Sequence, residues 1–277
     1  MNTQPSVLMY HYVRDSERTK YPTIRALKVD DFRRQLDFLQ AHYRILHYSE
    51  YEQMLQDAVF PDEPIALLTF DDGLTDHYEI VFPMLKERGL SAVFFLCDST
   101  LEESPHLINA HRIHFLLAQL GADMLKQELL EGLESIGHPL LRDEEERSGL
   151  YQYDGSADSY IKRLLNYELV YDVADDVLRL LCERHFGDEV AFAHSLYLTR
   201  EQAQEMVQSD MFFGAHTTNH RILSRISVSE QREELAPGVS CIRSLTQQAS
   251  IPFSYPYGHT HTYTEETIQL LEDLGYG

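Results

Sequence analysis

The sequence of 277 residues contains no tryptophan and only three cysteines, Cys97, Cys182 and Cys241. No two of them stand at C-x-x-C spacing and their number is odd, which argues against a disulfide framework and predicts three reduced, buried thiols. No apolar run reaches the roughly 18 residues that a membrane-spanning helix needs. The first residues are polar and do not resemble a secretion signal. Unless a leader precedes Met1, we therefore expect a cytoplasmic protein.

Basic residues are also scarce, since 23 Lys and Arg face 45 Asp and Glu and the formal net charge is −22. Such a surface repels phosphate backbones and anionic lipids, so we expect no nucleic-acid partner and no docking on membranes through a basic patch. The composition is 43% hydrophobic, enough for a sizeable core, and the length is ordinary for a single α/β barrel. The oligomeric state is not indicated.

Short apolar runs alternate with segments of helical periodicity over most of the chain. This alternation predicts a parallel sheet, either open or closed into a barrel. The predicted strands are Val7–Tyr10, Tyr43–Tyr48, Pro64–Phe70, Ser91–Cys97, Met211–Ala215 and Pro252–Tyr255. The predicted helices are Asp30–Tyr43, Glu50–Val59, Thr75–Arg88, Arg200–Gln208, Ser229–Gln248 and Thr264–Leu274, with a break expected at Pro237-Gly238.

The alternation is interrupted from about residue 101 to 200, where almost only helical periodicity is found. We interpret this stretch as a helical insertion in a single domain that spans residues 1–277. Its predicted helices are Ile108–Leu120, Met124–Ile136, Tyr160–Leu169 and Val173–His185, with a loop at Gly149–Gly155.

Two polar clusters follow predicted strands, where α/β barrels carry their reactive groups. Asp71 and Asp72 come directly after the strand Pro64–Phe70. Two adjacent carboxylates are costly there unless their charge is used, although D-D-G is also common turn chemistry. His216 and His220 follow the strand Met211–Ala215 and can converge on one ion if the segment is a helical turn. Two unrelated polar histidines are the alternative.

A third cluster follows the last predicted strand and reads Ser254-Tyr255-Pro256-Tyr257-Gly258, with His259 and His261 behind it. Pro and Gly around an aromatic residue indicate a rigid loop with an exposed backbone N–H, which is a donor that can stabilise an oxyanion. Taken alone, this cluster is better explained as an ordinary aromatic-rich turn.

Together these motifs resemble those of the polysaccharide deacetylases, carbohydrate esterase family 4 with its NodB homology domain. The resemblance rests on T-F-D-D-G, H-T-T-N-H and Y-P-Y-G and on the opening L-M-Y-H-Y-V. It extends from Val7 to Tyr276, with residues 101–200 outside the common core, and implies a distorted (β/α)7 barrel. The arrangement also resembles deacetylase-like proteins of surface-polysaccharide biosynthesis.

The resemblance further implies which residues act. Asp72, His216 and His220 would bind one divalent metal ion, commonly zinc, which would activate a water and the acetyl carbonyl. Asp71 would be the general base, and the backbone N–H of Tyr257 would stabilise the oxyanion. The residues assigned to substrate binding are His11, Tyr255, His259 and His261.

The sequence departs from the family pattern at two places. Ser254 stands where the family has an Arg that orients the catalytic Asp, and Arg112 or Arg163 is our candidate replacement. A terminal Leu-x-His motif, whose His is the general acid, is expected after Tyr276, beyond the last residue given. Either the chain continues or another residue protonates the leaving amine, with His11, His259 and His261 as candidates.

The leading hypothesis is a metal-dependent enzyme that removes N-acetyl groups from a sugar, in bacterial surface-polysaccharide, O-antigen-like biosynthesis. The expected substrate is nucleotide-linked, lipid-linked or an oligosaccharide precursor. One alternative is a catalytically impaired binding or scaffold protein, suggested by the missing Arg and terminal His. The other is a metal-dependent amidohydrolase that acts on a non-sugar amide or formyl group.

Overall fold

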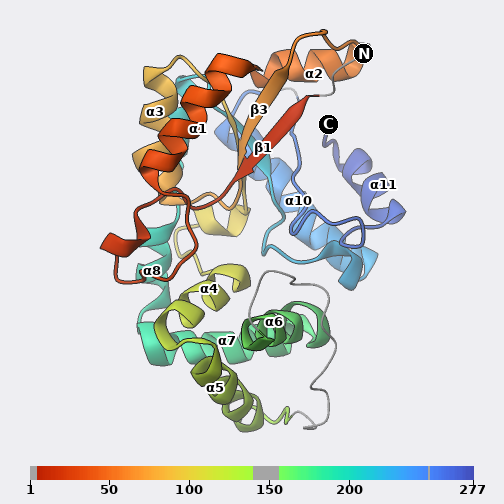
Figure 1. The fold of residues 1–277 in the computed structure, drawn as a ribbon. Helices are drawn as coiled ribbons and strands as arrows, with labels where there is room; N and C mark the ends of the chain where they lie inside the picture. The colour runs from red at the N-terminus through yellow and green to blue at the C-terminus, as the bar shows by residue number, and fades with distance from the viewer. Residues whose placement is uncertain (1–4, 140–155, 249) are drawn as a thin grey trace. The chain divides into compact units, whose positions relative to one another are not determined.

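The computed structural model describes residues 5–139, 156–248 and 250–277, and the chain folds into two compact units (Figure 1). The first unit comprises the described residues of 1–16, 25–105 and 194–277. The second comprises those of 17–24 and 106–193. The predicted loop at Gly149–Gly155 lies outside the described residues.

A parallel sheet forms the centre of the first unit. Its order is β1-β3-β4-β5, and β2 pairs with the beginning of β3. A single parallel bridge between Ala215 and Phe253 adds one more segment beside β5. All six residues of β3 are buried, as its continuous apolar run predicts. The strands are β1 (Ser6–Tyr10), β2 (Arg44–Ile45), β3 (Ile65–Phe70), β4 (Val93–Leu96) and β5 (Phe212–Ala215).

The predicted α/β class with a parallel sheet is confirmed, whereas closure of the sheet into a seven-stranded barrel stays a prediction. The prediction for Pro252–Tyr255 was too long, because only Phe253 makes a bridge there. Likewise, the predicted strand Tyr43–Tyr48 is limited to two residues, since α2 already begins at Tyr48.

Helices connect the strands of the first unit. They are α1 (Val29–His42), α2 (Tyr48–Asp57), α3 (Phe82–Glu87), α9 (Arg200–Gln208), α10 (Val228–Leu245) and α11 (Glu265–Leu274). A π-helical turn, His77–Val81, leads into α3. The predicted break at Pro237-Gly238 was wrong, because α10 continues through it. Leu235 before the proline and Val239 and Ile242 after it are buried, so core packing holds both halves in one helix.

Capping boxes fix where the last three helices begin. In each, the side chain of the residue before the helix accepts a hydrogen bond from the backbone N–H three residues later. The side chain of that later residue accepts a hydrogen bond from the backbone N–H of the first. The pairs are Thr199 with Gln202 (α9), Ser227 with Glu230 (α10) and Thr264 with Thr267 (α11).

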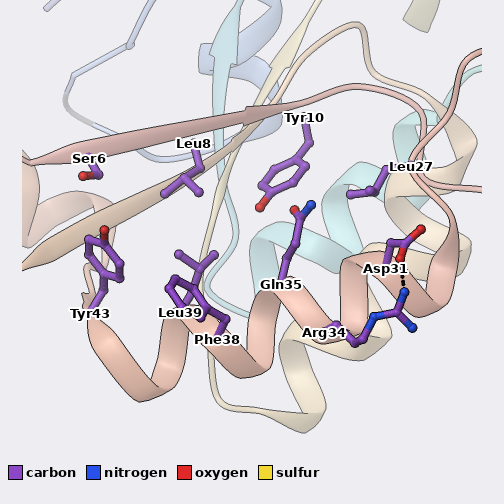
Figure 2. Close-up of a pocket in the computed structure, with 10 residues that line it drawn as sticks. All are labelled: Ser6, Leu8, Tyr10, Leu27, Asp31, Arg34, Gln35, Phe38, Leu39 and Tyr43. Atoms are coloured by element: carbon purple, nitrogen blue, oxygen red, sulfur yellow. Dashed lines mark hydrogen bonds and ion pairs between the residues drawn. The ribbon is translucent and has the colours of Figure 1, made fainter.

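A cavity of about 690 Å³ lies between β1 and α1 in the first unit. Figure 2 shows Leu8 and Tyr10 of the strand facing Gln35, Phe38 and Leu39 of the helix, with apolar groups predominating. The cavity belongs to the interface between strand and helix, on the α1 side of the sheet.

The second unit is helical, and its helices are α4 (Asn109–Leu120), α5 (Ala122–Ser135), α6 (Ser156–Arg163) and α7 (Tyr171–Phe186). A further helix, α8 (Glu189–Leu196), was not predicted and leads back to the first unit. The apolar faces of α4, α5 and α7 form a separate core that includes Leu116, Leu129 and Leu178. Residues 17–24, which precede α1, also belong to this unit, and the sequence did not indicate this.

All three cysteines are free. The predicted burial is confirmed for Cys97 and Cys182 and was wrong for Cys241, which is partly exposed. In the described part of the chain, no helix is both long and apolar enough to cross a membrane.

Candidate metal centre

The carboxyl ends of the parallel strands bring the polar clusters together. Register pairs Tyr10 with Phe70 across β1 and β3, and Leu96 with Ala215 across β4 and β5. Ala215 in turn bridges to Phe253. His11, Asp71, His216 and Ser254 therefore each follow a strand end at the same edge of the sheet, where parallel α/β folds build their sites.

Asp72, His216 and His220 form a cluster in which one ligand atom of each lies within 4.8 Å of the others. Oδ1 of Asp72 is 3.7 Å from Nε2 of His216 and 3.5 Å from Nε2 of His220. Asp72 and His216 are buried, at 3% and 1% exposure. Two imidazoles and one carboxylate at these separations match the ligand set of a catalytic divalent-metal site.

His216 is oriented as a metal ligand is. Its Nδ1 donates to the backbone oxygen of Ser254 at 2.7 Å, because a carbonyl can only accept. In the neutral imidazole Nε2 then carries the lone pair, and this atom is buried without a hydrogen-bond partner. A backbone carbonyl on the outer nitrogen is the usual support of a metal-binding histidine. The side chains present thus fit a divalent metal ion.

Asp71 lies beside this cluster and is 2% exposed. Its backbone N–H donates to the backbone oxygen of Tyr10 at 2.9 Å, and the Ser254 hydroxyl donates to its Oδ2 at 3.1 Å. Its other oxygen, Oδ1, is buried without a hydrogen-bond partner. Burial raises the pKa of Asp71, while positive charge on His216 and His11 would lower that pKa. A bound cation would act in the same lowering direction.

Ser254 is therefore the side chain that orients Asp71 where the resemblance implies an Arg. The two arginines predicted as replacements pair with acidic groups of the second unit instead. Arg112 pairs with Glu189 at 2.6 Å, and Arg163 pairs with Glu168 at 3.0 Å. The prediction that Arg112 or Arg163 serves Asp71 gains no support from these contacts.

Backbone strain is concentrated at this site. Of the six non-glycine residues with positive φ in the described part of the chain, four belong to the predicted motifs, namely Asp72, Thr217, His220 and Tyr257. Such conformations cost about 1–3 kcal/mol each and collect at functional sites. His216 and His220 therefore converge through a loop with left-handed residues and not through the helical turn that the sequence suggested.

Gly73, directly after Asp72, has a φ of 64° and a Cβ there would lie 2.7 Å from Cδ2 of Leu96. We expect Gly73→Ala to lower the free energy of unfolding by about 1–3 kcal/mol, measured by urea denaturation. Gly89→Ala is the matched control, since its φ is 63° but nothing lies within 4 Å. Equal losses in the two variants would show that the contact with Leu96 contributes nothing.

The third cluster contributes Tyr257, whose ring packs on His220 with centroids 5.0 Å apart. Tyr255 stacks on Tyr263. His259 stacks on His261, and these two histidines are exposed. From the first strand, Nε2 of His11 reaches to 4.0 Å from Oδ2 of Asp72. The oxyanion role of Tyr257 and the substrate-binding roles of His11, Tyr255, His259 and His261 stay predictions.

Sequence reasoning missed three buried groups that support the site. Asp98 follows β4 and accepts from the Thr218 hydroxyl at 2.9 Å, and burial raises its pKa to about 6. Because Asp98 comes shortly after a buried strand, the sequence could have indicated that it lies near the site. His77 donates from Nε2 to the backbone oxygen of His11 at 3.1 Å, and burial lowers its pKa to about 3. The carboxylate of Glu234, on α10, accepts two hydrogen bonds from Asn219 in the loop that carries His216 and His220.

The fold and the site thus define an α/β protein with a candidate mononuclear metal centre at the carboxyl edge of a parallel sheet. The sequence profile described as polysaccharide deacetylase matches residues 59–140 and 164–277. The chain belongs to the polysaccharide deacetylase family.

This chain is also similar to individual proteins, at low sequence identity. YxkH of Bacillus subtilis (strain 168), whose name provisionally assigns it to the polysaccharide deacetylases, is 22% identical over 98% of this chain. The chain spans only 61% of that relative's length.

Two solved structures share the fold. The Streptococcus pyogenes deacetylase PplD in complex with acetate has a TM-score of 0.58 at 20% identity, covering 100% of this chain and 82% of its own. The de-N-acetylase from Aggregatibacter actinomycetemcomitans has a TM-score of 0.55 at 14% identity, covering 98% and 85%.

Proposed function

We propose that this protein is a divalent-metal-dependent deacetylase, with zinc as the expected metal, that removes N-acetyl groups from a sugar. The observation that carries this proposal is the convergence of Asp72, His216 and His220 beside the buried carboxylate of Asp71. The buried Nε2 of His216 lacks a hydrogen-bond partner, and a metal ion would coordinate its lone pair.

Each residue has a task in this proposal. Asp72, His216 and His220 would hold the metal ion, which when bound supplies a Lewis acid for the acetyl oxygen and for water. Asp71 takes the proton of the attacking water on Oδ1, because Ser254 already holds Oδ2. The backbone N–H of Tyr257 donates to the oxygen on which negative charge develops.

Protonation of the leaving amine requires a further group. His11, His259 and His261 are the candidates from the sequence, and His11 contacts the cluster through Asp72 at 4.0 Å. His77 fixes the backbone oxygen of His11, which keeps this residue at the end of β1. We therefore favour His11 for the proton transfer.

The substrate proposal is an N-acetylated sugar in bacterial surface-polysaccharide, O-antigen-like biosynthesis. Family membership supports an acetylated polysaccharide or its precursor, nucleotide-linked, lipid-linked or oligosaccharide. The similar fold of a protein named a de-N-acetylase supports an amide over an ester by analogy. A cytoplasmic location and the single-domain organisation stay predictions.

We expect the purified protein to release acetate from N-acetylated sugars in a reaction that stops after chelation and returns with added zinc. Acetate is measured by an enzyme-coupled assay on a panel of N-acetylated sugars, O-acetylated sugars and N-formylated or N-acetylated non-sugar amides. Activity only on the non-sugar amides would favour the amidohydrolase alternative. Metal binding without turnover on any compound would favour a catalytically impaired binding protein, which the replacement of the family Arg by Ser254 also suggests.

A further inference from the structure

The loop that carries both histidines has no regular secondary structure of its own. It runs from His216 to His220 after β5, with left-handed conformations at Thr217 and His220. Such a backbone persists only where its surroundings hold it. The groups that hold it therefore decide whether His216 and His220 meet Asp72.

Glu234 is the principal side chain that bonds this loop from α10. Its Oε2 accepts from the backbone N–H of Asn219 at 2.8 Å, and its Oε1 accepts from Nδ2 of Asn219 at 2.8 Å. Its backbone oxygen accepts from the N–H of Thr218 at 2.9 Å. Arg221, directly after His220, places its Nε 3.5 Å from Oε1. Glu234 thus contacts the segment from Thr218 to Arg221, which includes His220, at three of its four residues.

Glu234 is 3% exposed, so the charge of its carboxylate is removed from water and depends on these donors. Bonds from N–H groups to a buried carboxylate are charge-assisted and roughly twice as strong as neutral ones. Loss of the charge would leave the N–H groups of Asn219 with a weaker partner and free the loop to leave its strained conformation.

The position of α10 makes these contacts possible. At Gly238, one turn after Glu234, a Cβ would lie 3.0 Å from Cβ of Ala215 and 2.8 Å from the Tyr276 hydroxyl oxygen. Ala215 ends β5 and precedes His216. The helix therefore passes close to the strand end, which puts Glu234 next to the loop.

We propose that Glu234 is a positioning residue for the metal centre, which fixes the 216–220 loop so that His216 and His220 converge on Asp72. The proposal rests on the proposed metal site. It assigns no contact between Glu234 and the metal or substrate; the effect passes through Asn219 and the loop backbone.

Glu234→Gln tests this at constant volume, since it retains one oxygen and removes the charge. The zinc Kd of the metal-free protein is measured by competition with a chromogenic chelator, and we expect it to rise about 10–100-fold, as for other outer-shell partners. Glu233→Gln, an exposed neighbour on the same helix, is the control and should leave the Kd unchanged.

A merely structural role would behave differently. It would lower the melting temperature of the metal-free protein but leave the zinc Kd of the folded protein as in the wild type, and that result would overturn the proposal. If Glu234→Gln does not fold, Asn219→Ala removes only the side-chain bond to Oε1. This variant should still weaken zinc binding several-fold, and an unchanged Kd would again overturn the proposal. Failure of the wild type to bind zinc would overturn the metal site itself, and with it the role of Glu234.

Discussion

The His216→Ala variant is expected to lose its bound metal ion, whereas the wild-type protein carries about one zinc or similar ion per chain. The substitution removes the imidazole whose Nε2 lies 3.7 Å from Asp72 and whose Nδ1 is fixed by Ser254. Two remaining ligands bind a divalent ion far more weakly than three, so the Kd should rise at least about 100-fold. Elemental analysis of the purified protein checks this, with a zinc titration for the Kd.

A matched control tests whether the effect is specific to the site, since the chain has 14 histidines in all. His194→Ala removes an exposed imidazole on α8 and should leave the metal content unchanged. Asp72→Ala should behave as His216→Ala does, because the Asp72 carboxylate faces both histidines. No metal in the wild type, even after reconstitution, would sink the hydrolase mechanism and make the non-catalytic alternative the leading one.

The strands that the sequence predicted well are those buried on both faces. Pro64–Phe70 and Ser91–Cys97 are continuous apolar runs, and β3 and β4 lie within them. Strands at the side of the sheet were harder to predict, because the length of a strand is decided by pairing with its neighbour and not by its composition. Pro252–Tyr255 has strand-like residues, but only Phe253 bridges to β5. The helix α8 was missed, and its residues show little helical segregation of polar and apolar groups.

The candidate site was predictable because parallel strands end at a common edge. Asp71, Asp72 and His216 each follow an apolar run, so the topology predicts that they lie at one edge of the sheet, whereas the resemblance to the deacetylases supplied the metal-ligand set. The contacts that hold them were not predictable. Glu234 lies within α10, where a glutamate ordinarily faces solvent. Only the fold places its carboxylate against Asn219 in the 216–220 loop. The partner of Asp71 was likewise sought among arginines, whereas the segment that bridges to β5 at Phe253 supplies Ser254.

The Asp71→Asn variant is expected to retain its metal ion and to lose about 10²–10⁴-fold in the rate of acetate release. Asp71 is not among the three clustered ligands, so its replacement by an amide of the same shape leaves them in place. The amide cannot accept the proton of an attacking water, whereas the carboxylate offers the buried, unpartnered Oδ1. Metal content and acetate release are measured on the same preparation.

The comparison with His216→Ala distinguishes a general base from a metal ligand, because His216→Ala should lose metal and turnover together. Loss of turnover alone in Asp71→Asn separates the base from the ligands, although the two carboxylates are adjacent in sequence. Full activity in Asp71→Asn would contradict the general-base role. Loss of the metal in Asp71→Asn would instead place Asp71 among the ligands, and the proton acceptor would then be sought first at His11, whose Nε2 lies 4.0 Å from Asp72.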